Sequence, residues 1–220
     1  MEQEMENVLI VGANGKTGRE IVDILHVKDH FRPIAMVRNE EQAKYFIDLG
    51  VETVLADLEE VDMEPALKNI DRIIFAAGSG SETGKEKTLS VDRDGAIQLM
   101  DAAVKREIKK FVMLSSMGTE NPSDESDLYV YLRAKHEADE HLKASGLNYT
   151  IVRPGKLSDK AATGNIRISK KQLDTMGEIS RHDVAQVLTY SLHDHLLPNK
   201  TVEIIEGPKA IRPALEALSE

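Results

Sequence analysis

Val8-Leu-Ile-Val-Gly-Ala-Asn-Gly-Lys-Thr-Gly18 is the stretch of this 220-residue chain that decides its fold. Four apolar residues, typical of a buried strand, lead into glycines at every third position, and an amphipathic helical pattern follows over residues 19–27. Gly12 allows a turn that a Cβ would block, Gly15 lets the backbone approach a pyrophosphate, and Gly18 lets the helix pack against the strand. Because the N-terminus of that helix would face the phosphates, the stretch predicts a dinucleotide-binding turn.

The composition limits the class of protein. The chain has no cysteine, which excludes disulfides, thiol nucleophiles and zinc–thiolate sites, and its 41% of hydrophobic residues suffices for a full core. The net charge of −10 argues against nucleic acid and anionic membranes as partners. No apolar run approaches the length of a membrane span, and the acidic N-terminus is unlike a secretion signal. We therefore expect a cytoplasmic protein.

Short apolar runs alternate with helical patterns along the chain, which predicts a parallel sheet covered by helices. The runs typical of strands are Val8–Val11, Ile34–Val37, Thr53–Leu55, Arg72–Ala76, Lys110–Leu114 and Tyr149–Arg153. The helical patterns are Lys16–Val27, Glu40–Leu49, Met63–Lys68, Lys87–Arg106 and Leu128–Ala144. After Pro154 we expect a strand or hairpin around Asn165–Ser169, a helix Arg181–His193, a strand Thr201–Ile205 and a helix Ile211–Leu218. The fold class is therefore α/β: a single doubly wound Rossmann domain over residues 1–220, with a mostly parallel sheet, helices on both faces and a small substrate-side region at 154–220.

Two segments rich in turn-forming residues, 78–84 and 118–127, are predicted to be loops. Each follows a predicted strand, so both should lie at the carboxyl ends of strands. Open α/β sheets bind their ligands at that edge.

The end of the second predicted strand bears on the choice of cofactor. An acidic residue about twenty positions beyond the last glycine is typical of NAD binding, because it accepts from the ribose hydroxyls. Here the position holds Arg38, followed by Asn39. A guanidinium can clamp a 2′-phosphate, which favours NADP and makes NAD the less favoured cofactor. The alternative is a solvated arginine, with Asn39 capping the next helix.

Two further strand ends carry candidate cofactor contacts. Asp57, followed by Leu58, could accept from an adenine amino group, or it could simply stabilise a turn. Ala76-Ala77-Gly78 ends the fourth strand with small residues, which would let a ribose or nicotinamide lie flat against the backbone. Small residues would serve helix packing equally well.

The helix predicted over residues 128–144 holds the candidate chemistry. At 100° per residue, an inward stripe contains Tyr131, Lys135, Ala138 and Leu142, and the solvent face contains Arg133, His136, Glu137, Glu140 and Lys143. A charge on the inward stripe needs a partner, and ribose hydroxyls of a bound cofactor would provide one for Lys135. Its ammonium would also lower the pKa of the Tyr131 phenol. The alternative is a partly buried tyrosine with a lysine that reaches the surface.

In chain order, Gly12/Gly15/Gly18, Asp57, Ala76-Ala-Gly78, Ser115-Ser116 and Tyr131/Lys135 resemble the short-chain dehydrogenase/reductase superfamily. The spacing of the glycines is similar to that of its extended and atypical branches. These include epimerase/dehydratase-like proteins, NmrA-like redox sensors and flavin/biliverdin reductases. Segments 114–119, 131–135, 149–155 and 179–185 look most like small bacterial NAD(P)-binding proteins of the atypical group. The resemblance extends over nearly the whole chain and specifies fold and cofactor better than reaction.

The resemblance implies roles for individual residues. Tyr131 would donate a proton to a substrate carbonyl, and Lys135 would hold the nicotinamide ribose and tune the phenol. A serine at the end of the fifth strand would polarise the same carbonyl; Ser116 is preferred and Ser115 comes next. Extended enzymes often carry a Ser/Thr triplet there, and its third place is Met117 here, so a hydroxyl required at that place would be missing. Further contacts with phosphates or nicotinamide would come from Asn14, Lys16, Thr17, Arg153 and Pro154.

We expect an enzyme that reduces a small carbonyl or related acceptor with NADPH. One alternative is an NmrA-type redox sensor that binds a partner protein, although such proteins typically lack the Tyr/Lys pair. A second alternative is an epimerase or dehydratase acting on a sugar nucleotide, which usually needs a larger C-terminal region. We expect no metal site, because His193 and His195 form the only close histidine pair and no third ligand is evident.

Overall fold

The computed structural model describes residues 5–27, 30–60, 62–78, 88–124 and 126–219. Its main sheet has the strand order β11-β8-β10-β6-β5-β4-β1-β2-β3. Those strands are β1 (Glu6–Val11), β2 (Phe31–Val37), β3 (Glu52–Leu55), β4 (Arg72–Phe75), β5 (Lys110–Leu114), β6 (Tyr149–Pro154), β8 (Asn165–Ser169), β10 (Lys200–Glu206) and β11 (Lys209–Ala210). A separate pair consists of β7 (Lys156–Ser158) and β9 (Glu178–Ser180). The helices are α1 (Lys16–His26), α2 (Glu40–Asp48), α4 (Ala96–Lys105), α5 (Tyr129–Ala144), α6 (Arg181–Tyr190) and α7 (Ile211–Ser219), with a 3₁₀ turn η1 (Glu64–Leu67) and a π-helix η2 (Leu89–Gly95).

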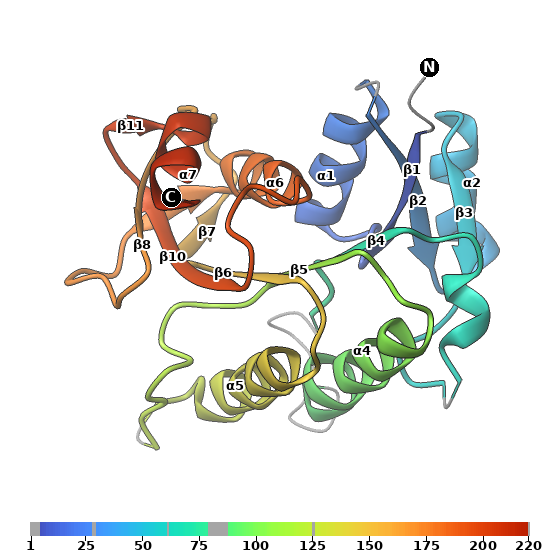
Figure 1. Cartoon of the computed structure of the whole chain (residues 1–220), viewed down its shortest axis with the longest axis horizontal. Helices are drawn as coiled ribbons and strands as arrows, with labels where there is room; N and C mark the ends of the chain where they lie inside the picture. Colours follow the sequence, from blue (N-terminus) through green and yellow to red (C-terminus); the bar gives the residue numbers. More distant parts are fainter. Residues whose placement is uncertain (1–4, 28–29, 61, 79–87, 125, 220) are drawn as a thin grey trace.

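The strand order confirms the predicted doubly wound fold. From β3 through β10 every neighbouring pair of strands is parallel, and only β8, which pairs with β10 and β11 at one edge, runs antiparallel to its neighbours. Starting from β1, the strands β2 and β3 are added on one side and β4, β5 and β6 on the other (Figure 1). The strand order therefore reverses direction between β1 and β4. Ligands of such sheets bind outside the carboxyl ends of the strands at this reversal.

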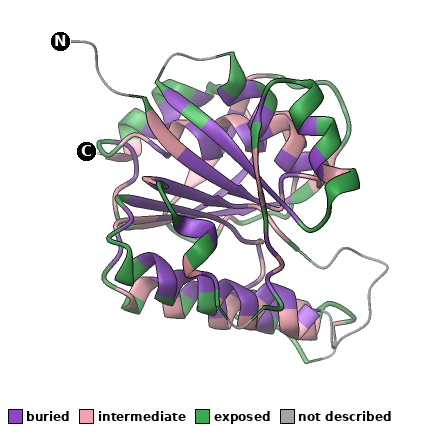
Figure 2. Cartoon of the chain, turned by 90° about the vertical axis from the view of Figure 1, so that its right-hand side faces the viewer, coloured by how far each residue is buried: buried purple, intermediate pink, exposed green. Residues whose placement is uncertain are grey.

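Helices cover both faces of the sheet, as predicted. Along β1, Val8 and Ile10 pack into a core with α1, α2, α6 and α7, whereas Leu9 and Val11 pack into a second core with η1, η2, α4 and α5. Figure 2 shows the buried strands between helices whose outward faces are exposed. Alternate side chains of each central strand therefore pack into cores on opposite faces of the sheet. This is why the central strands are apolar throughout.

The structure differs from the prediction mainly in short or irregular elements. The helix predicted over 87–106 is divided into η2 and α4, and the one predicted over 63–68 is only the 3₁₀ turn η1. The short strands β7, β9 and β11 were not predicted, because two or three residues cannot display a period. The helix predicted to reach His193 ends at Tyr190. Of the loop predicted at 78–84, residues 79–84 lie outside the described residues.

No helix in the described part of the chain is long and apolar enough to cross a lipid bilayer.

Lys110 at the start of β5 gives a prediction about stability. Its side chain is fully buried and donates from Nζ to Asn148 Oδ1 at 3.0 Å. Burial disfavours the ammonium and lowers the pKa of Lys110 to about 8. Between that pH and its ordinary value of 10.5, the unfolded chain holds a proton that the folded chain has released. The free energy of unfolding of the native chain should therefore rise with pH across this window.

Lys110→Met should accordingly stabilise the protein at pH 7, by about 1–3 kcal/mol after the lost hydrogen bond is counted. The gain should shrink towards pH 10.5. Urea unfolding at several pH values tests this, with Lys68→Met at an exposed position as the control. A stabilisation of equal size at every pH would contradict the linkage.

Candidate functional site

The turn between β1 and α1 lies where the strand order reverses, and two of its glycines have no room for a side chain. Gly12 has a φ of +83°, and a Cβ on it would lie 2.6 Å from the backbone N of Ala77. A Cβ on Gly18 would lie 2.2 Å from the carbonyl oxygen of Gly12. Gly15 is exposed, and its N–H donates to Gly12 O at 3.0 Å. The turn is thus closed on itself and against the end of β4, which leaves its outer face open.

A cleft of about 310 Å³ opens at this place. Nine residues predicted to bind the cofactor line it, and these are Gly12, Asn14, Gly15, Arg38, Asp57, Leu58, Ala76, Ala77 and Gly78. Sequence reasoning missed the other five lining residues, which are Val11, Met36, Gln42, Ala56 and Val91. The cleft therefore collects the ends of β1, β2 and β4 and the segment after β3, as the topology predicts.

The lining of the cleft suits a dinucleotide. Met36, Ala56, Leu58 and Val91 provide an apolar slot that can take a flat base, whereas Asn14, Arg38, Gln42 and Asp57 provide polar groups around it. The glycine turn supplies backbone at the N-terminus of α1 without an obstructing Cβ. The residues present therefore fit the group that the sequence predicts.

Arg38 follows β2 at the rim of the cleft. Its side chain is exposed, and within the described ranges no acceptor pairs with its guanidinium. Its backbone N–H donates to Gln42 Oε1 at 3.0 Å. Asn39 caps α2 as predicted, since its Oδ1 accepts the N–H of Gln42 at 3.0 Å.

Three other residues predicted to contact the cofactor differ in their surroundings. Asp57 accepts the N–H of Glu59 at 3.1 Å, so it stabilises a turn while also lining the cleft. Lys16 does not line the cleft; its Nζ lies 2.6 Å from Asp159, which also pairs with Arg181 at the start of α6. Thr17 is buried in the first turn of α1.

The predicted stripe on α5 faces the sheet. Lys135, Ala138 and Leu142 are buried, and Tyr131 is partly buried with its ring centroid 5.9 Å from the Lys135 Nζ. His136, which was predicted on the solvent face, is partly buried, and its Nδ1 is inaccessible to solvent. The periodicity therefore placed the stripe correctly but made the solvent face too wide.

Lys135 has protein partners that the sequence did not reveal. Its Nζ lies 3.0 Å from Oδ1 of Asp92 in η2 and donates to the carbonyls of Ala77 and Leu114 at 3.3 Å each. Burial alone would lower the pKa of Lys135, but Asp92 and Tyr131 outweigh it and raise the pKa, so the ammonium stays charged. Asp92 is fully buried in a π-helix, an irregularity frequent at functional sites. The sequence did contain a sign of this partner, because Asp92 is an acidic residue on the apolar face of the helix predicted over 87–106.

Lys135 lowers the pKa of the Tyr131 phenol as expected, but the net shift of that pKa is upward, opposite to the expectation. Burial raises the pKa of Tyr131, and the neighbouring carboxylates of Asp92 and Asp139 add to this. Lys135 and a hydrogen bond with Ser116 lower it by less, so the pKa ends above its ordinary value of 10.0. Tyr131 is therefore a neutral phenol at neutral pH and can donate a proton.

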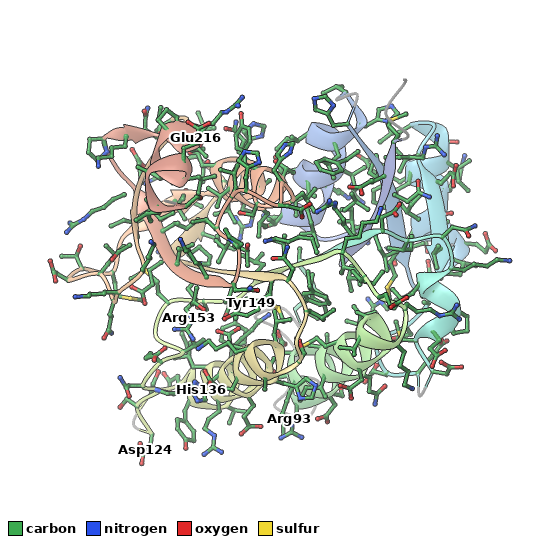
Figure 3. All side chains as sticks on the ribbon, in the orientation of Figure 1. Arg93, Asp124, His136, Tyr149, Arg153 and Glu216 are labelled. Carbon is green, nitrogen blue, oxygen red and sulfur yellow. The ribbon has the colours of Figure 1, made fainter. Side chains whose placement is uncertain are left out.

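The two candidate serines lie in different surroundings. Ser115 is buried and donates to Asp139 Oδ2 at 2.8 Å, and the same oxygen accepts from Arg153 Nε at 2.9 Å. Arg153 also donates to Glu120 at 2.5 Å, and its side chain extends from β6 towards α5 (Figure 3). Neither Ser115 nor Arg153 lines the described cleft.

Ser116 is only partly buried, donates to Met117 O at 3.1 Å and interacts with the Tyr131 phenol. Of the two serines, it is the one beside Tyr131. Met117, at the third place of the predicted triplet, is buried. Pro154 ends β6 and is buried.

His193 and His195 lie away from this site, with ring centroids 5.7 Å apart. Among the residues with described positions, no group of three potential ligands is arranged to hold a metal ion.

Comparison with known proteins agrees with this geometry. Residues 12–195 match the model of a family described as NAD(P)H-binding. The sequence is 41% identical to YhfK of Bacillus subtilis, named an uncharacterized sugar epimerase, over 96% of this chain and 99% of that protein. A solved structure from Bacillus halodurans, provisionally named an NAD-dependent epimerase/dehydratase, is 43% identical with a TM-score of 0.90 and covers 96% of this chain and 99% of its own. The oxidoreductase ylbE from Lactococcus lactis is 32% identical with a TM-score of 0.84 and 96% coverage of each chain.

Proposed function

Because the chain belongs to the NAD(P)H-binding family of Rossmann-fold proteins, we propose that it is an NADP(H)-dependent oxidoreductase acting on a small carbonyl or related acceptor. The observation that carries the proposal is the bond from Lys135 to the carbonyl of Ala77, a residue that lines the cleft. That bond ties the helix bearing Tyr131 to the edge where the cofactor would lie. Tyr131 and Lys135 do not themselves line the described cleft, so this bond to a lining residue is what supports a proton donor acting beside it.

Each residue of the site has a distinct role in the proposed reaction. A bound nicotinamide would supply a hydride. Tyr131 donates its phenolic proton to the substrate oxygen, and Ser116, whose hydroxyl donates to Met117 O before substrate binds, would turn to donate a hydrogen bond to the same oxygen. Lys135, held charged by Asp92, stabilises the phenolate that remains on Tyr131 after the transfer. Asp92 acts through Lys135 and is a positioning residue.

The preference for NADP is tested at Arg38. Arg38→Asp removes the cation available to a 2′-phosphate and adds an acid that accepts ribose hydroxyls. We expect the Kd for NADPH to rise by about 10–100-fold, while the Kd for NADH stays unchanged or falls. Fluorescence titrations with both nucleotides measure this. Arg32→Asp, at an exposed position of the preceding strand β2 that does not line the cleft, is the control. An unchanged ratio of the two affinities would remove the argument for NADP.

A second candidate function, a redox sensor without turnover, is favoured by the bonds of Lys135. An ammonium has three protons, and Asp92, Ala77 and Leu114 already offer three acceptors. A ribose hydroxyl would have to displace one of the two bonds of 3.3 Å. A sensor would bind a partner protein with an affinity that differs between the NADP⁺ and NADPH forms. Equal affinity of the two forms, together with turnover of an acceptor, decides for the enzyme.

The names of two relatives point to sugar epimerases or epimerase/dehydratases, which we rank third. Such chemistry on a sugar nucleotide usually needs a larger C-terminal substrate region. In this chain much of the sequence after Pro154 instead continues the main sheet through β8, β10 and β11 or packs on it as α6 and α7. This arrangement favours a small acceptor over a second nucleotide.

A further inference from the structure

Gln42 lies in the first turn of α2 and lines the cleft together with Arg38. Its backbone N–H donates to Asn39, and its side-chain Oε1 accepts the N–H of Arg38. These bonds resemble a capping box, in which a residue three positions after the cap reaches back to the preceding backbone. Capping of α2 is sufficient to account for the side-chain oxygen of Gln42, which accepts the Arg38 N–H.

The other half of the amide remains at the cleft. Because a backbone N–H requires an acceptor, the bond to Arg38 fixes which end of the amide is oxygen. The Nε2 group, with two N–H donors, is therefore on the opposite side, and no acceptor among the described residues takes it up. Arg38 and Gln42, which both line the cleft near the end of β2, thus carry a guanidinium and an amide donor with no acceptor among the described residues.

The choice of amide rather than acid is informative. A glutamate would accept the Arg38 N–H equally well, and its charge would favour the N-terminus of a helix. The same turn already contains Glu40 and Glu41, so acidic residues are tolerated in it. A neutral donor at the one position of the turn that lines the cleft is what a bound dianion requires.

We infer that Gln42 is a second specificity determinant for NADP(H), donating from Nε2 to the 2′-phosphate beside Arg38. This inference rests on the proposed preference for NADP. It assigns to the phosphate one charged and one neutral ligand, both positioned by the same cap of α2.

Gln42→Glu tests the inference, because it retains the shape and the capping acceptor but replaces the donor with a negative charge. We expect the Kd for NADPH to rise by about 10–100-fold, with the Kd for NADH unchanged or lower and the melting temperature unchanged. Gln42→Ala, which loses the donor without adding charge, should weaken NADPH binding by about 3–10-fold. Gln98→Glu makes the same chemical change at an exposed position of α4 and should alter neither affinity.

The outcomes are distinguishable. If Arg38→Asp changes the NADPH-to-NADH ratio and Gln42→Glu does not, Gln42 is a helix cap only and the inference is overturned. The same holds if Gln42→Glu weakens both nucleotides equally while lowering the melting temperature. If the native protein shows no preference for NADPH and Arg38→Asp has no effect, the proposed NADP preference itself fails, and this inference fails with it.

Discussion

Tyr131→Phe is expected to lower turnover by about 10²–10⁴-fold while leaving the Kd for NADPH unchanged. The ring keeps its packing on α5, and only the proton donor is removed. Because burial raises the pKa of Tyr131 above 10.0, the phenol stays protonated through neutral pH. Turnover of the native enzyme should therefore fall only in strongly alkaline solution, as the donor loses its proton.

The assay is oxidation of NADPH with a panel of small aldehydes, ketones and quinones, using the acceptor that the native protein reduces fastest. Tyr129→Phe is a matched control, because Tyr129 lies on the same helix and, among the described residues, its hydroxyl has only an exposed bond accepted from Arg133 at 3.3 Å. Full turnover by Tyr131→Phe would exclude Tyr131 as the proton donor. Equal losses in both variants would indicate damage to α5 rather than lost chemistry.

Gly18→Ala is expected to reduce affinity for NADPH by about 100-fold, the equivalent of about 3 kcal/mol, and to lower stability. The added Cβ would lie 2.2 Å from Gly12 O and 2.8 Å from Ala13 Cα, both of which are backbone atoms. Neither can move without displacing α1 from β1. Nucleotide titration and thermal unfolding measure the two effects.

Gly15→Ala provides the graded comparison. A Cβ at Gly15 would lie 3.3 Å from Gly12 O, a tight contact that a small shift relieves. Its effect on affinity should therefore be well below that of Gly18→Ala. If Gly18→Ala binds NADPH like the native protein, the packing role assigned to this glycine is wrong.

The fold was predictable because its signals are local and repeated. Val8–Val11 is apolar at every position and is followed at once by the glycine turn, and β5 was predicted with its observed bounds. The topology then brought the ends of β1, β2 and β4 together, so that the cleft could be predicted without any knowledge of distances.

The buried charges at the site were less predictable. Lys135 could be placed on the inward face by periodicity, but its partner Asp92 lies 43 positions earlier in a π-helix that no regular period describes. The pKa of Tyr131 was predicted in the wrong direction for the same reason. A lysine four residues away was visible in the sequence, whereas the extent of burial and the approach of two carboxylates, Asp92 from η2 and Asp139 from further along α5, were not.

The two serines show the same limit. Neighbours in sequence at a strand end point in different directions, so Ser115 meets Asp139 while Ser116 meets Tyr131. Sequence order alone could not assign the hydroxyl, because the deciding partners lie on α5 and on β6.

The most direct test of the proposed chemistry is a crystal structure with NADP⁺ bound, in which one distance is read: from the Tyr131 hydroxyl to C4 of the nicotinamide. We predict a separation within roughly 5 Å beside an open cavity, so that proton and hydride can reach one carbonyl group. A hydroxyl that points away from C4, or a nicotinamide face closed by side chains, would contradict the reductase and favour a sensor.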